Sequence, residues 1–201
     1  MRVILYSAIF LLTILQSFGQ DSRIASGFTI EPFVGYSQST FIDGNVPMAA
    51  YLRTYSLGVI GNYYFNDTWS IRSGIVKDRM GGSLFGIRVT SPQGTVFLSS
   101  KVLEQEFVSF PIQANWHFGK RKRWNLAFGV SYALAIGDKL EFGDQEYTSF
   151  IGGAIDIGYR YPLGAGHLVI RSSALVRSEN DTSIYSGQRR SSISLGYAYG
   201  F

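Results

Sequence analysis

Apolar and polar residues alternate along most of the chain beyond Gln20, which is the period of a β-strand with two different faces. The clearest run ends at Phe118, and its apolar residues are Val108, Phe110, Ile112, Ala114, Trp116 and Phe118. The residues between them are mostly polar, and no long segment carries the stripe of an amphipathic helix. The pattern therefore predicts an all-β chain.

The alternation predicts eight strands joined by links of alternating length. The strands are expected at residues 28–36, 55–65, 69–75, 107–118, 124–134, 151–161, 168–176 and 193–201. Short links rich in turn residues lie at 66–67, 119–123 and 162–166, and long links lie at 42–53, 78–102, 137–148 and 178–189. An antiparallel up-and-down barrel with one tight rim and one decorated rim produces this order.

Aromatic residues decide between a barrel in lipid and a soluble barrel, which would show the same alternation with its apolar face inward. All three Trp residues lie beside a short link, at the alternate positions that carry the apolar residues of each strand. We call these positions the apolar parity, and Tyr and Phe residues accompany the Trp residues there. They form the aromatic girdle of one bilayer interface: Tyr63, Phe65, Trp69, Trp116, Phe118, Trp124, Tyr159 and Tyr161. Aromatics that cap a soluble core need not gather at one rim, so we favour the membrane barrel.

The full prediction is an eight-stranded antiparallel up-and-down transmembrane β-barrel with short periplasmic turns and long extracellular loops. Its opposite parity carries small and hydroxyl residues, which suit a narrow lumen. Four charges of that parity lie near one height: Glu31, Arg72, Asp156 and Arg171. Because unpaired charges in a lumen are costly, we expect the cations to meet the acids and this charged layer to close the lumen.

The N-terminal segment is expected to be a secretory signal. Arg2 precedes an apolar run that ends at Leu15, and small residues follow up to Gly19. We therefore assign 1–19 to a signal peptide and 20–201 to the barrel domain. A membrane anchor is the alternative, but the apolar run is shorter than the roughly 18 residues that a spanning helix needs.

Composition narrows the function classes further. Only 16% of the 201 residues are charged and the formal net charge is +4, which argues against a disordered chain and a nucleic-acid binder. No Cys is present, which excludes disulfides, thiolate metal sites and a thiol nucleophile.

The run 194–201 resembles the signal by which outer-membrane barrels are recognised for assembly, with Gly196, Tyr199 and Phe201 at the matching positions. The mature chain resembles the PorT-like outer-membrane β-barrel family of Gram-negative bacteria, through residues 58–65, 69–75 and 107–112. Ser109 stands where that family usually has Glu. The resemblance implies location and architecture, and one member of the family assists a protein-secretion machine.

Neither histidine has the companions of a catalytic or metal site. His117 and His167 flank short links, and only Asp156 or Glu31 lies near enough to be a third metal ligand. We interpret both as half-buried residues at the lumen mouth and expect no catalytic, cofactor-binding or metal residues. The basic run 120–123 lacks the interleaved aromatics of a nucleic-acid surface and is expected to be a solvated turn beside lipid phosphates.

These expectations favour a non-enzymatic integral outer-membrane protein whose extracellular loops make it a surface, envelope-structural or secretion-accessory component. A small-solute pore is the alternative, and a lipid-modifying enzyme of the outer membrane is a further one. The expected partners are outer-membrane lipid, the barrel-assembly machinery through the C-terminal strand, and an extracellular or periplasmic protein that the sequence does not identify. No nucleic acid is expected.

Overall fold

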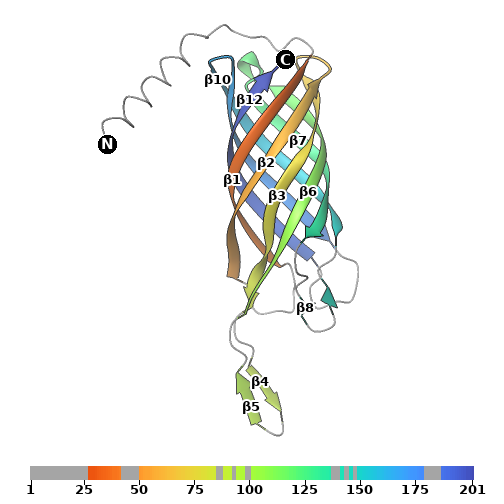
Figure 1. Ribbon diagram of the computed structural model, residues 1–201, viewed down its shortest axis with the longest axis vertical. Helices are drawn as coiled ribbons and strands as arrows, with labels where there is room; N and C mark the ends of the chain where they lie inside the picture. Colours follow the sequence, from red (N-terminus) through yellow and green to blue (C-terminus); the bar gives the residue numbers. More distant parts are fainter. Residues whose placement is uncertain are drawn as a thin grey trace, which may run out of the picture.

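The computed structural model is a closed barrel of eight antiparallel strands (Figure 1). It describes residues 27–41, 50–84, 88–91, 94–97, 101–136, 141–142, 145–146, 149–178 and 187–201. The segment 1–19, predicted to be a signal peptide, lies outside the described residues. Within the described ranges, no helix is long and apolar enough to cross a membrane.

The barrel strands follow one another around the wall in chain order. They are β1 (Phe28–Phe41), β2 (Ala50–Tyr64), β3 (Trp69–Leu84), β6 (Lys101–Phe118), β7 (Trp124–Ile136), β10 (Phe150–Leu163), β11 (Gly166–Ser178) and β12 (Gly187–Gly200). Each strand pairs antiparallel with its neighbours, and β1 pairs with β12 to close the wall. The predicted eight-stranded up-and-down barrel is confirmed.

The two faces of each strand differ as the alternation predicts. On β10, Ile151, Ile155 and Ile157 are exposed outward, whereas Asp156 and Arg160 are buried in the lumen. Successive side chains of a strand point to opposite faces, so a strict period of two gives the wall an apolar outside and a polar inside.

The strands are staggered around the barrel. The stagger can be measured by following paired residues from strand to strand around the wall. Starting at Arg189 on β12, the path reaches Ile30 on β1. The partners on the way are Val176, Gly153, Val130, Ile112, Ser73 and Gly61. The direct partner of Arg189 on β1 is Thr40, so one circuit shifts the register by ten residues, from residue 40 to residue 30. Such a stagger accompanies strands that are tilted to the barrel axis. Two residues at the same height on neighbouring strands are therefore not paired directly. Each lies about 1.25 residues along its strand from the partner of the other.

Three tight turns define one rim. Between β2 and β3, the Asn66 side chain accepts hydrogen bonds from the backbone nitrogens of Thr68 and Trp69, both at 2.9 Å. Between β6 and β7 the chain forms a short 3-10 turn, η1 (Lys120–Lys122), in which Arg121 has a φ of 61°. Gly164 has a φ of 61° between β10 and β11, a conformation that favours glycine.

Several strands are longer at the opposite rim than the sequence pattern predicts. β3 continues to Leu84 and β6 begins at Lys101, because their pairing extends from Asp78 opposite Phe107 to Leu84 opposite Lys101. β2 begins at Ala50 and β12 at Gly187. The predicted links 42–53, 78–102 and 178–189 were therefore too wide, since charged residues at the strand ends resembled loop sequence.

Two small hairpins accompany this second rim. β4 (Arg88–Ser91) pairs with β5 (Gly94–Phe97), and β8 (Glu141–Phe142) pairs with β9 (Gln145–Glu146). Figure 1 shows the β4–β5 hairpin beyond the end of the barrel, at the rim opposite the tight turns. The longest connection of the chain thus carries secondary structure of its own outside the wall.

Candidate functional site in the barrel lumen

The inward parity brings polar side chains from every strand into one narrow lumen. Buried charged residues of the described part include Glu31, Arg72, Asp78, Asp156, Arg160 and Arg171. Hydroxyl and amide side chains fill much of the space between them. Because a buried charge is tolerated only when it is paired or hydrogen-bonded, their contacts decide what the lumen can do.

The first part of a middle layer is the ion pair between Arg72 on β3 and Asp156 on β10. Arg72 Nη1 lies 3.1 Å from Asp156 Oδ2, and the Arg72 side chain is 1% exposed. Arg72 Nε also donates a hydrogen bond of 3.0 Å to Asn62 Oδ1. The pair spans the lumen between strands that are not neighbours in the wall.

The second part of the middle layer joins Arg171 on β11 to Glu31 on β1. Arg171 Nη2 lies 2.5 Å from Glu31 Oε1, and both side chains are 3% exposed. β12 lies between these strands, and a Cβ placed on its Gly196 would come within 2.8 Å of Glu31 Oε1. The absence of a side chain at Gly196 therefore leaves the space through which the Glu31 carboxylate reaches Arg171.

All four residues of the predicted charged layer are thus brought together in pairs, Arg72 with Asp156 and Arg171 with Glu31. Two amide side chains of the neighbouring strand β6 lie near this layer: Asn115 donates to Ser70 Oγ at 3.1 Å, and Gln113 is buried. That this layer closes the lumen remains a prediction, which conductance can test.

The sequence pattern did not predict a second charged layer, which we call the outer layer. It lies nearer the rim at which the long links leave the wall, opposite the three tight turns, and we call that rim the long-link rim. Asp78 on β3 forms an ion pair with Arg190 on β12. An apolar cluster also fills the lumen in this half of the barrel: Met80, Phe107, Ala133, Phe150 and Leu175. Asp78 and Arg190 share the inward parity of Arg72 and Ser194, a signal that was available but was hidden because both residues fell at the borders of predicted links.

A cavity of about 40 Å³ separates the middle layer from the outer layer. Its lining includes Asp156 and Arg171 of the middle layer, Arg190 of the outer layer, and the serine residues Ser56, Ser109, Ser131, Ser173, Ser192 and Ser194. Within the described protein, Ser109 Oγ, Gln113 Oε1 and Arg171 Nε have no hydrogen-bond partner. A polar space of this size suits a few ordered water molecules that satisfy these atoms.

A third group, the mouth network, lies at the tight-turn rim. Arg160 donates to Tyr64 Oη at 2.6 Å, to the Lys122 carbonyl at 3.0 Å and to His117 Nδ1 at 3.1 Å. Because a guanidinium only donates, His117 Nδ1 must accept, which places the imidazole proton on Nε2. His117 Nε2 then donates to Ser70 Oγ at 2.9 Å.

The two histidines occupy different environments. His117 is fully buried in the mouth network, so its predicted half-burial was wrong, whereas His167 is half-buried near the turn between β10 and β11. His117 loses its exposure because Arg160 and Tyr64 enclose it under the β6–β7 turn. Among the described residues, no three His, Asp or Glu side chains are grouped as a metal site would require.

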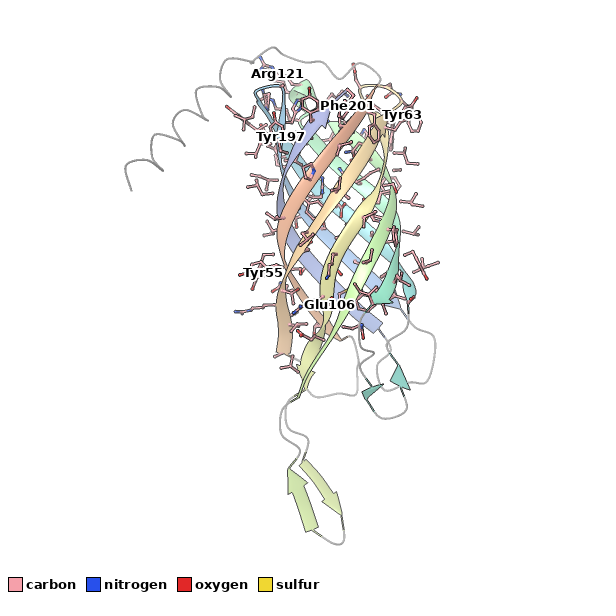
Figure 2. All side chains as sticks on the ribbon, viewed as in Figure 1. Tyr55, Tyr63, Glu106, Arg121, Tyr197 and Phe201 are labelled. Atoms are coloured by element: carbon pink, nitrogen blue, oxygen red, sulfur yellow. The ribbon has the colours of Figure 1, made fainter. Side chains whose placement is uncertain are left out.

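The predicted girdle residues lie on the outward parity around the tight-turn rim. Tyr63, Phe65, Trp69, Trp116, Trp124 and Tyr161 are exposed, and Phe118 and Tyr159 are half-exposed. Neighbouring rings are in contact, with centroids 4.8 Å apart for Trp116 and Phe118 and 4.9 Å apart for Trp124 and Tyr159. Figure 2 shows Tyr63, Tyr197 and Phe201 at this end of the barrel.

The three residues assigned to the assembly signal lie on β12 and at its end. Gly196 faces the lumen beneath Glu31, as described above, and Tyr199 and Phe201 face outward with ring centroids 5.1 Å apart. Phe201 is 78% exposed, so its ring contributes little to packing within the barrel. The structure therefore provides a local role for Gly196, whereas the recognition role of all three remains a prediction.

A comparison of the sequence with protein families gives a result that agrees with this barrel, which is apolar outside and charged inside. The family model described as "Outer membrane protein beta-barrel domain" matches residues 18–198. The chain belongs to this family of outer-membrane β-barrel domains. Its location in the outer membrane, predicted from the girdle and the strand pattern, is thereby confirmed.

Solved structures agree with the fold of this outer-membrane β-barrel domain. Neisserial surface protein A is similar with a TM-score of 0.56 and 15% identity, over 88% of this chain and 98% of that one. The outer membrane protein OprG from Pseudomonas aeruginosa is similar with a TM-score of 0.53 and 12% identity, over 88% and 97%. At these identities the likeness shows the fold alone. No curated protein sequence matches the chain.

Proposed function

We propose that this protein is a non-enzymatic integral outer-membrane component that acts through the segments beyond its long-link rim, and that it does not conduct solutes. The observation that supports this most strongly is the filled lumen. The middle layer, the outer layer and the mouth network occupy three successive levels, and the cavity between two of them holds only about 40 Å³. A solute pore needs a continuous water-filled path, which larger barrels have.

The orientation of the barrel is part of this proposal. In bacterial barrels the short turns face the periplasm and the longer loops face outward. We therefore assign the rim with Asn66, Gly119 and Gly164 to the periplasm and the rim with the β4–β5 hairpin to the exterior. A hairpin held beyond the wall is accessible to other molecules, which supports a surface, envelope-structural or secretion-accessory role.

The PorT-like resemblance favours the secretion-accessory form of this role, although Ser109 departs from the family pattern. Ser109 is buried beside the lumen cavity and its hydroxyl has no partner in the described protein. A Glu at this position would place another carboxylate beside Asp156 and Arg171, which line the same cavity. The departure thus changes the lumen and leaves the outside of the barrel unaltered.

A lipid-modifying enzyme is disfavoured by the placement of the histidines. His117 is engaged in the mouth network and His167 lies at the same rim, which is the periplasmic one in the proposed orientation. Chemistry on outer-leaflet lipid would need its acid–base groups at the opposite rim, within hydrogen-bond reach of the lipid.

Planar-bilayer recording of the purified full chain tests the closed lumen. We expect no sustained conductance from the wild type, and stable porin-like steps would contradict the proposal. Photo-crosslinkers at positions 90 and 95 of the β4–β5 hairpin then test the role of the exterior, with a crosslinker at position 121 of the periplasmic turn as the control. The hairpin positions should capture a partner in intact cells that position 121 does not, and the absence of such a product would count against the proposed role.

A further inference from the structure

Among the barrel-strand side chains that the structure describes, the charged ones on the outer surface of the wall lie on one arc. Among barrel-strand residues whose side chains the structure describes, the outward-facing charges are Arg53, Lys77, Arg79, Glu104, Glu106 and Arg189. They come from β12, β2, β3 and β6, and the fifth strand of the arc, β1, contributes the exposed Gln38 between Arg53 and the β12 strand. We call this set the charged arc.

Four members of the charged arc lie at about one height, toward the long-link rim. With the stagger of about 1.25 residues per strand, Arg189, Arg53, Arg79 and Glu106 fall at the same level. At that level the other strands present Leu134, Ile151 and Val176, all exposed and apolar. Figure 2 shows Tyr55 and Glu106 toward the end of the barrel opposite Tyr63 and Phe201. Cations that merely extended to water at a membrane interface would not need to gather on one side.

Two of the cations already have acidic partners. Lys77 Nζ lies 3.2 Å from Glu106 Oε2, and Arg79 Nη2 lies 2.7 Å from Glu106 Oε1. Arg79 Nη1 is also 3.7 Å from Glu104 Oε1. These pairs form the edge of the arc on β3 and β6.

The other two cations have no acidic partner in the part of the chain that the structure describes. Within the described residues, neither Arg53 nor Arg189 is in an ion pair, and Arg189 Nη2 donates only a long hydrogen bond of 3.4 Å to Tyr51 Oη. Arg53 lies opposite Gln38, and Arg189 lies opposite Thr40, so the two arginines flank β1. They are separated by two strand spacings, or about 10 Å, and the exposed Tyr51 and Tyr55 lie beside them.

We propose that Arg53 and Arg189 bind phosphate groups on the headgroup of an outer-leaflet glycolipid of the lipid A type. This rests on the orientation given under the proposed function. The side of a membrane barrel faces lipid, so the ligand at this height is a lipid headgroup. Phosphate is the anion that matches paired guanidinium groups, because each guanidinium offers parallel N–H donors to two phosphate oxygens. The apolar residues below the arc, Val34 and Leu57, are exposed to the acyl chains of the same lipid.

Binding of lipid A to the purified full chain in detergent micelles tests the site. Three variants are compared with the wild type: R53Q/R189Q, the charge-retaining R53K/R189K, and K120Q/R121Q at the opposite rim as the matched control. Each basic residue near an anionic surface contributes about 1 kcal/mol, so R53Q/R189Q should bind roughly thirty-fold more weakly. R53K/R189K should bind between these values, and K120Q/R121Q should bind as the wild type does.

The chemistry of the ligand is tested with two further probes. Lipid A from which both phosphates have been removed should bind the wild type no more tightly than R53Q/R189Q binds intact lipid A. E104Q/E106Q, which releases Lys77 and Arg79 from their acids, should bind intact lipid A more tightly than the wild type. Inorganic phosphate at millimolar concentration should compete weakly, because it has no acyl chains.

Three results would overturn the site. The first is equal affinity of R53Q/R189Q and the wild type, and the second is undiminished binding of the dephosphorylated lipid. The third is a loss confined to K120Q/R121Q, which would place phosphate binding at the other rim and reverse the orientation. None of these depends on conductance or on the hairpin crosslinks, so the lipid site and the proposed function can fail separately. A gel shift between boiled and unboiled samples confirms that each variant is folded.

Discussion

The same chemical pairing of a guanidinium with a carboxylate occurs in two environments of this barrel. In the lumen, Arg72 and Asp156 meet across the middle layer with little exposure, whereas on the outer surface Arg79 meets Glu106 with both side chains substantially exposed. Buried charges that lose a partner are strongly destabilising, and exposed pairs contribute little because water and salt screen them. The comparison predicts that the lumen pairs maintain the folded barrel and that the surface pairs control what binds to it.

The largest effect is expected when one partner of a lumen pair is removed. Asp156→Ala leaves Arg72 buried without its acid and should lower the free energy of unfolding by about 3–5 kcal/mol. The double change R72M/D156L removes both charges and should cost much less, because no unpaired charge remains. Urea unfolding in lipid vesicles, followed by Trp fluorescence, measures both. Equal stability of the single and double variants would show that the pair does not matter.

A smaller effect is expected when the charges of a lumen pair are kept and only the space beside them is filled. The added methyl group of Gly196→Ala would press on Glu31 Oε1, and also on Phe33 Cβ and the Pro32 carbonyl oxygen, each 3.0 Å from the new Cβ. The destabilisation should be about 1–3 kcal/mol, as for other overpacked interiors. Adding Glu31→Gln to this variant should not recover the loss, because Gln has the same size as Glu and leaves Arg171 without its acid. Wild-type stability of Gly196→Ala would show that the space beside Glu31 is not tight.

A substitution at Phe201 should affect assembly in cells much more than it affects the stability of the folded barrel. Its ring is 78% exposed at the membrane interface, so Phe201→Glu should change the stability of the refolded barrel by only about 0–1 kcal/mol. On the hypothesis that Phe201 belongs to the assembly signal, the same variant should be several-fold less abundant in the outer membrane of cells. Immunoblots of membrane fractions measure this, with Tyr161→Glu as an exposed aromatic control outside β12. Normal levels of the Phe201 variant would remove it from the signal.

The smallest effect on stability is expected on the outer surface. Glu106→Gln removes the acid shared by Lys77 and Arg79, which are both exposed. We expect the urea midpoint to be unchanged, because solvent already screens these contacts. A midpoint shift comparable to that of Asp156→Ala would abolish the distinction between the two environments.

The strands and their faces were predictable because a lipid-facing wall with a narrow polar lumen imposes a strict period of two. That is why the girdle residues and the four residues of the middle layer could be located by parity alone. Parity also applies to Asp78 and Arg190, but charge near a strand end resembles loop sequence, so the pattern predicts links close to both residues. The lengths of β3, β6 and β12 could be decided only by pairing across the wall.

The choice of partners in the lumen was less predictable. Either acid could have met either arginine by parity, and the outcome depends on the stagger of the barrel, which alternation does not contain. Likewise, His117 was expected at a half-open mouth, and its burial results from Arg160, which is 43 positions away in sequence and lies two strands along the wall. The charged arc is similar, because Arg189 on β12 comes beside the members on β2, β3 and β6 only when β1 pairs with β12.

The glycine beneath Glu31 also has a kinetic consequence. Glu31 and Arg171 are separated by 140 positions in sequence, and they can meet only after β1 has paired with β12 across the open space at Gly196. A partly assembled sheet would therefore hold an unpaired carboxylate at one edge and an unpaired guanidinium near the other. The ion pair between Glu31 and Arg171 therefore forms only when the sheet closes into a barrel. The last step of insertion should consequently slow in the Glu31→Gln variant, which removes that carboxylate's charge, while formation of the earlier hairpins proceeds unchanged.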